Sequence, residues 1–198
     1  MHHKICLVCL LVLSLASGFV ALTAGAQQQQ QQPQQGVYAG EERREIKSLS
    51  PEEIEQLLQG HGMGLAKAAE LNHYPGPRHV LDLGAQLELT SKQRAETQGA
   101  FARMQEEAVR LGRQIVERER ALDAMFAGGE IDAGKLRAAT SDIARLQGDL
   151  RAAHLAAHLE MRRLLSPRQI KRYDELRGYS GASEQKPGAP HRHDHGKH

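Results

Sequence analysis

The chain has 198 residues, with 26 basic side chains, 24 acidic side chains and a formal net charge of +2. So balanced a charge gives no reason to expect nucleic acid as a partner. Aromatic residues make up only 4% of the chain, which favours slim, closely packed helices over a core built on large rings.

The first segment has the composition of a secretory signal peptide. Lys4 supplies a positive charge, residues 5–22 form a mostly apolar run without a charged side chain, and Ala24-Gly25-Ala26 matches a small-x-small cleavage pattern. The run is also long enough for a retained membrane anchor, but its small-residue end favours cleavage after Ala26. Both cysteines lie inside this segment. We therefore expect an exported, periplasmic protein whose mature chain has no disulfide.

Composition divides the rest of the chain into three parts. Residues 27–48 begin with a Gln-rich, low-complexity stretch and are predicted to form a disordered linker. Residues 180–198 are rich in Gly, Pro, Ser and His and are predicted to form a disordered tail. Between them, residues 49–179 show helical spacing of apolar side chains throughout, which indicates a single helical domain.

Three positions have the pattern of a helix start. Each places a hydroxyl three residues before Glu or Gln, in Ser50-Pro51-Glu52-Glu53, Thr90-Ser91-Lys92-Gln93 and Ser166-Pro167-Arg168-Gln169. This spacing predicts a capping box, in which the hydroxyl accepts from a backbone N–H and the longer side chain reaches back to the cap residue. Proline at the first helical position of two of them supports the assignment, because that N–H has no helical partner.

The predicted helices are long. Residues 90–127 follow one helical repeat that ends at Gly128-Gly129, and residues 132–164 follow a second. The short loop between them makes an antiparallel hairpin. Residues 51–71 and a short helix around residues 79–87 can cover one side of it. We predict an all-α fold: a long antiparallel helical hairpin with shorter N-terminal helices, paired as a cradle-like dimer.

Two of the predicted helix starts share a longer motif. Leu89-Thr90-Ser91-Lys92-Gln93 is an LTxxQ sequence, and Leu165-Ser166-Pro167-Arg168-Gln169 is a second copy with Ser for Thr. Two such copies behind a signal peptide resemble the LTxxQ family of periplasmic proteins, which includes Spy/CpxP-like chaperones, periplasmic heavy-metal sensors and zinc-resistance proteins. The resemblance covers about residues 49–179. It implies a dimeric cradle that holds partly unfolded clients without ATP, with motif residues Leu89, Thr90, Gln93, Leu165, Ser166 and Gln169.

Basic side chains gather near the second motif: Arg162, Arg163, Arg168, Lys171 and Arg172. Together with neighbouring Leu and Met side chains, they predict a surface that holds many clients weakly, by charge attraction and then by apolar contact. The alternative is an ordinary solvated helix face.

Histidines are frequent, and two of them have metal-ligand spacing. His154 and His158 are four residues apart on the second long helix, so both imidazoles leave the same side of it. Met161 is one turn further and offers a thioether for a softer ion. His61, with Met63, could add ligands if the first helix crosses nearby. The alternative is that His154 and His158 are edge residues of an amphipathic helix.

The C-terminal tail has a chelating sequence of its own. It contains His191, His193, His195 and His198, with Asp194 among them. Such a segment can take up zinc, nickel or copper weakly without any fold.

No catalytic motif is present. The mature chain has no cysteine nucleophile, GxSxG elbow, HExxH sequence or nucleotide-binding loop. We expect no enzyme and no required cofactor. The leading hypothesis is an ATP-independent, envelope-stress chaperone that binds unfolded or misfolded envelope proteins. The alternative is a periplasmic heavy-metal-binding sensor or resistance protein that uses His154, His158 and the tail. A third is a regulatory partner of a membrane sensor protein.

Overall fold

The computed structural model describes residues 36–180, and the helices belong to one compact unit that begins at Tyr38. The elements in chain order are the 3-10 helix η1 (Glu41–Arg43) and the helices α1 (Pro51–Leu58), α2 (Lys67–Glu70), α3 (Pro77–Asp82), α4 (Ser91–Ala127), α5 (Ala133–Leu164) and α6 (Pro167–Arg177). No strand occurs in residues 36–180, and the predicted all-α fold is confirmed. The signal segment, the Gln-rich run and residues 181–198 lie outside the described residues.

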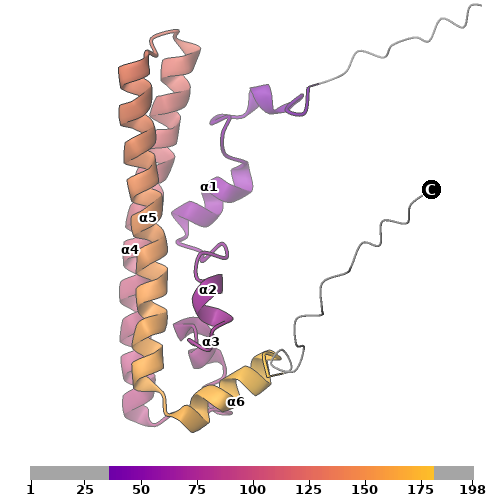
Figure 1. Cartoon of the computed structure of the whole chain (residues 1–198), viewed down its shortest axis with the longest axis vertical. Helices are drawn as coiled ribbons and strands as arrows, with labels where there is room; N and C mark the ends of the chain where they lie inside the picture. Colours follow the sequence, from indigo (N-terminus) through magenta and orange to yellow (C-terminus); the bar gives the residue numbers. More distant parts are fainter. Residues whose placement is uncertain (1–35, 181–198) are drawn as a thin grey trace, which may run out of the picture. The chain divides into compact units, whose positions relative to one another are not determined.

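Helices α4 and α5 form the predicted hairpin (Figure 1). The 37 residues of α4 extend about 55 Å, because an α-helix rises about 1.5 Å per residue. The turn between the helices includes Gly129 in a left-handed conformation (φ 67°). Asp132 then caps α5, accepting a hydrogen bond from the backbone N–H of Lys135 at 2.8 Å. We call the end of the hairpin where α4 begins and α5 ends its base.

The N-terminal helices pack on one side of the hairpin (Figure 1). Helix α1 contacts α4, α2 contacts α5, and α3 contacts both. At the α1 crossing, Gly112 of α4 has no side chain, and a Cβ there would overlap the backbone carbonyl of Leu57. A glycine is therefore required where the two backbones meet.

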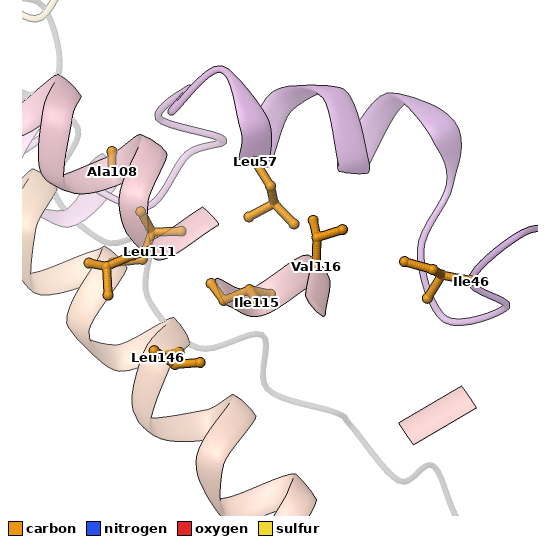
Figure 2. Close-up of a cluster of buried hydrophobic side chains, with 8 residues drawn as sticks. Ile46, Leu57, Ala108, Leu111, Ile115, Val116 and Leu146 are labelled. Carbon is orange, nitrogen blue, oxygen red and sulfur yellow. The ribbon is translucent and has the colours of Figure 1, made fainter. Parts of the chain in front are cut away.

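Two buried clusters hold the unit together. The first lies between α1 and the hairpin (Figure 2) and consists of Ile46, Leu57, Ala108, Leu111, Ile115, Val116, Leu146 and Leu150. The second lies near the base and consists of Val80, Leu87, Ala100, Met161, Leu165, Ile170 and Tyr173. Helix α6 closes the second cluster through Ile170 and Tyr173.

The N-terminal part differs from the sequence-based expectation in three respects. The folded part begins before residue 49, since Ile46 is fully buried and Lys47 Nζ lies 3.0 Å from Asp123 Oδ2. Residues 51–71 form two helices and not one. Residues with left-handed backbone conformations, including Gly60 (φ 65°) and Gly64 (φ 76°), interrupt the helix between α1 and α2. The expected helix at residues 79–87 is α3, which begins and ends earlier.

No helix among the described residues combines the length and the apolar character needed to cross a membrane.

Candidate functional site

Both LTxxQ motifs form capping boxes. The hydroxyls of Thr90 and Ser166 accept hydrogen bonds from the backbone N–H groups of Gln93 (3.1 Å) and Gln169 (3.3 Å). In return, the side-chain oxygens of the glutamines accept from the backbone N–H groups of Thr90 (3.1 Å) and Ser166 (2.9 Å). The motif leucine Leu165 is buried in the second cluster, and Leu89 packs against it. The motifs therefore start α4 and α6 and anchor both starts in one core.

The two motif glutamines also bind each other. Gln93 Nε2 donates to Gln169 Oε1 at 2.9 Å, and Gln169 Nε2 donates to Gln93 Oε1 at 3.0 Å. Each amide donates a further hydrogen bond to a backbone carbonyl, Gln93 to Leu164 and Gln169 to Leu87, both at 3.1 Å. All four amide N–H groups and both oxygens can be used in this arrangement. The pair holds the base of the hairpin together and leaves no polar group free for a ligand.

A cleft of about 450 Å³ separates the N-terminal segment from the hairpin, and four histidines line it. His61 comes from the turn after α1, His79 from α3, and His154 and His158 from α5. Phe101, Met104 and Gln105 of α4 form part of its wall, and the backbone contributes Gly60, Gly62 and Gly76. We call this the histidine cleft.

A backbone hydrogen bond orients the ring of His158. Its Nδ1 lies 2.7 Å from the carbonyl oxygen of Tyr74. A carbonyl can only accept, so Nδ1 is the nitrogen that bears hydrogen, and in the neutral ring Nε2 keeps its lone pair. A side chain at Gly76 would come within 3.3 Å of Nε2, so glycine leaves space beside this nitrogen.

His154 is buried without a partner. Its residue is only 4% exposed, and Nε2 has no hydrogen-bond partner among residues 36–180. Burial, and secondarily the neighbouring His158, lower the pKa of His154 below its ordinary value, because both disfavour a charged ring. The ring is therefore held neutral, the form in which an imidazole can ligate a metal.

The other predicted metal ligands have different positions. His61 and Met63 lie in the turn between α1 and α2, and not on a helix; His61 reaches the cleft. Met161 is buried in the second cluster, away from the cleft, whose sulfur-bearing side chain is Met104. No three His, Cys, Asp or Glu side chains of residues 36–180 lie close enough to hold a metal together. His191, His193, His195 and His198 lie outside the described residues.

The partly buried carboxylate of Glu70 connects the histidine cleft with α6. Glu70 Oε2 lies 3.7 Å from His158 Nδ1, and Glu70 Oε1 accepts from the hydroxyls of Tyr173 at 2.5 Å and Tyr179 at 3.3 Å. Arg177 Nε lies 3.4 Å from the same oxygen. Burial, and then the hydrogen bond to Glu70, raise the pKa of Tyr173 well above its ordinary value. Nothing in the sequence pattern indicates this network, because its members lie about a hundred residues apart.

The predicted client-binding cations are all exposed, but three have partners. Arg168 pairs with Glu88 at 3.4 Å, Arg172 with Glu175 at 3.1 Å, and the Arg162 guanidinium lies 5.7 Å from the Tyr74 ring centre. Arg163 and Lys171 form no ion pair within the described part of the chain. These two are the cations most available to another molecule.

The fold and these sites define an all-helical hairpin protein whose two LTxxQ motifs are joined through their glutamines. The family model described as heavy-metal resistance matches residues 63–172, more than half of the chain. The chain belongs to this family, the family of Spy/CpxP-like LTxxQ proteins, and the resemblance inferred from the two motifs is confirmed. No curated protein and no solved structure matches the chain.

Proposed function

We propose that this protein is an exported, periplasmic metal-binding protein that holds a divalent transition-metal ion in the histidine cleft. The observation that carries the proposal is the buried ring of His154, whose Nε2 has no partner in residues 36–180. A buried polar atom without a hydrogen bond costs about 1–3 kcal/mol, and native proteins keep few of them. A metal ion would use the lone pair that the fold leaves free.

The neighbouring His158 supports the same assignment. Metal-ligating histidines commonly donate their second ring nitrogen to a carbonyl or carboxylate, which fixes the tautomer and the ring orientation. His158 has such a bond to the Tyr74 carbonyl at 2.7 Å, with Glu70 beyond it at 3.7 Å. Its Nε2 therefore keeps a lone pair for a ligand, as that of His154 does, although His158 is oriented by a hydrogen bond and His154 is held by burial.

The side chains around the cleft suit zinc, nickel or copper. Imidazole nitrogens bind all three ions, and a thioether favours softer ones. His154 and His158 would hold the ion; His61, His79 and Met104 also line the cleft and would have to move closer to add a donor. The bound ion would be cargo or signal: no reaction is proposed, because the residues around the cleft form no nucleophile–base pair.

The test is titration calorimetry of the mature chain, residues 27–198, with each of the three ions. We expect one tight site per subunit that disappears in His154→Leu and in His158→Leu. The matched control is His73→Asn, which also removes one histidine but lies outside the cleft. His73 has a left-handed backbone (φ 65°), which Asn tolerates. Equal tight binding by all four proteins would exclude the histidine cleft as the metal site.

A second function, client binding, is favoured by the surface near the base. A groove of about 470 Å³ has apolar walls from Ala95, Met161 and Leu164 with Arg163 at its edge, and the side chain of Leu159 is 47% exposed. Such a surface suits weak binding of partly unfolded envelope proteins. The binding form would be a homodimer, and a membrane sensor protein would be a further partner.

Client binding is tested by suppression of the aggregation of a reduced model protein. We expect Arg163→Glu with Lys171→Glu to reduce suppression at least two-fold. The matched control is Arg118→Glu with Arg137→Glu, which reverses two charges at exposed arginines far along the hairpin from the groove. An equal loss in the control would show that only net charge matters. Sedimentation of the same samples would measure whether the protein is a dimer.

A further inference from the structure

The two carboxylate oxygens of Glu70 have unequal partners. Oε1 accepts hydrogen bonds from the hydroxyls of Tyr173 at 2.5 Å and Tyr179 at 3.3 Å. The Oε2 atom is buried and has no hydrogen-bond partner in the described part of the chain, although it lies 3.7 Å from His158 Nδ1. Native proteins leave few buried polar atoms unpaired. The unpaired oxygen therefore lies beside one of the two rings that would hold the ion.

The same side chains also meet through the backbone of residues 74–76. His158 Nδ1 lies 2.7 Å from the carbonyl oxygen of Tyr74, and the backbone N–H of Gly76 donates to the Tyr173 hydroxyl at 3.4 Å. A Cβ at Gly76 would come within 3.3 Å of His158 Nε2. A cleft histidine and a side chain of α6 thus contact the same three residues.

Glu70 is also the one acidic side chain among residues 36–180 that lines either cleft of this region. A second cleft, of about 370 Å³, is lined by Glu70 and Arg177 and shares His79 and His158 with the histidine cleft. Two neutral imidazoles cannot compensate the charge of a divalent ion, and charges a few ångströms apart interact strongly where water is scarce. Glu70 is therefore the counter-charge that the fold places beside the candidate site.

We propose that Glu70 is a positioning residue of the histidine cleft, through which a bound ion and α6 stabilise each other. This rests on the proposed metal-binding function. A bound ion makes the ring of a ligating histidine partly positive, which strengthens the attraction between its second N–H and a nearby carboxylate. Oε2 of Glu70 then gains a partner at His158 while Oε1 stays on the Tyr173 hydroxyl.

The element that responds to the ion is α6. Its Tyr173 is fully buried in the second cluster, whereas Lys171 and Arg172 are exposed on the same helix. Metal in the cleft would set how firmly this helix and its exposed cations are held. Coupling between two sites is reciprocal, so the contact of α6 with Glu70 would in turn set the metal affinity.

The first test is the zinc affinity of the mature chain, residues 27–198, measured by titration calorimetry. Tyr173→Phe keeps the buried ring and removes only the hydroxyl that reaches Glu70. We expect Tyr173→Phe and Glu70→Gln each to weaken zinc binding at least five-fold, and the double variant to bind no more weakly than Glu70→Gln alone. The matched control is Ile170→Val, which trims the packing of α6 in the second cluster but leaves Glu70 untouched. Its zinc affinity should stay within two-fold of the parent.

A second readout is the rate of tryptic cleavage after Lys171 and Arg172, which requires local opening of α6. Saturating zinc should slow this cleavage at least five-fold in the mature chain and less than two-fold in Glu70→Gln. If Glu70 only supported the fold, Glu70→Gln would change the cleavage rate by the same factor with and without zinc.

The outcomes separate this proposal from the metal-binding function. A tight zinc site that is unchanged in Tyr173→Phe and Glu70→Gln would overturn the coupling and leave the metal site standing. Equal protection of α6 by zinc with and without the Glu70 carboxylate would also overturn it, as would an equal loss of affinity in Ile170→Val. A mature chain without any tight zinc site would overturn both proposals.

Discussion

The glutamine pair and the histidine cleft both place polar side chains between helices, and they do so in opposite ways. Gln93 and Gln169 donate to each other and to two backbone carbonyls, at distances of 2.9–3.1 Å. His154 is as deeply buried as the core leucines, yet its Nε2 has no partner in residues 36–180.

The contrast distinguishes polar groups that stabilise the fold, such as the glutamine pair, from polar groups that are available to a ligand, such as His154. A satisfied pair stabilises the packing of the elements that it joins and has nothing left to offer a ligand. A buried ring nitrogen without a partner destabilises the protein, and its lone pair is available to a ligand. The motifs by which the family is found thus mark the scaffold, and the less regular histidines mark the candidate site.

The largest expected effect comes from breaking the glutamine pair. Gln93→Leu removes the bonds to Gln169 and to the Leu164 carbonyl, and we expect the free energy of unfolding to fall by about 2–3 kcal/mol because several polar groups lose their partners together. Urea denaturation measures this, with Gln98→Leu, an exposed position on the same helix, as the control. The double variant with Gln169→Leu should cost less than the sum of the two single changes. Strict additivity would show that the pair does not act as a unit.

Removing the unpartnered histidine of the cleft should stabilise the metal-free protein, the opposite of breaking the glutamine pair. His154→Leu should raise the free energy of unfolding of the metal-free protein by about 1 kcal/mol, because it replaces an unpartnered buried nitrogen with an apolar group. His158→Leu should lower it by about 1 kcal/mol, because the bond to the Tyr74 carbonyl is lost. Chemical denaturation with a chelator present measures both. A destabilised His154→Leu variant would mean that the ring is needed for packing, as expected of an ordinary edge residue.

The capping hydroxyls should contribute less than the glutamines. Thr90→Ala and Ser166→Ala each remove one bond to a backbone N–H, for an expected loss of about 1 kcal/mol. Thr90→Ser keeps the hydroxyl and serves as the control. Thermal melts compare the three. Unchanged melting temperatures in both alanine variants would contradict a role for the caps in stability.

The smallest expected change in the free energy of unfolding at neutral pH comes from Tyr173, whose contribution appears only at alkaline pH. The unfolded chain ionises this phenol near its ordinary pKa of 10.0, whereas the raised pKa keeps it neutral in the folded chain. The unfolded state therefore binds fewer protons above pH 10, and the free energy of unfolding should decline as the pH rises through that value. Tyr173→Phe should make this decline shallower. Melts at pH 8, 10 and 11 measure it, and parallel curves for the two proteins would refute the assignment.

The sequence predicted the features that depend on local pattern. The hairpin and the capping boxes follow from helical spacing and from a hydroxyl three residues before Glu or Gln, and both signals act within a few turns. The pairing of Gln93 with Gln169 joins residues 76 positions apart, so only the folded chain reveals it. The break at residues 60–64 was missed because its glycines were taken as part of a helical segment.

The ligand prediction shows the same limit. Met161 is three residues after His158 and seven after His154, so at 3.6 residues per turn all three lie within about 60° on one face of the helix, and spacing alone groups them. The structure separates them along the helix axis: Met161 enters the second cluster near the base, while Met104 of the opposite long helix lines the cleft. His79 follows a helix break that gives no metal-ligand spacing in the sequence, yet that break carries α3 to the cleft. Spacing locates the neighbours of a residue on its own helix, and not those on the facing one.

The connectivity of the hairpin also has a kinetic consequence. Helices α4 and α5 are joined by a short turn, so the contacts beside this turn join residues near in sequence, and the hairpin can close outward from it. The cleft needs residues 60–79 to dock on a hairpin whose histidines lie about 80 positions later, and such distant contacts carry a larger loop-closure entropy. We therefore expect the hairpin to form first and the cleft to be completed last. A metal ion that stabilises the cleft would then act mainly by slowing unfolding, so that metal in the medium sets the lifetime of the folded chain.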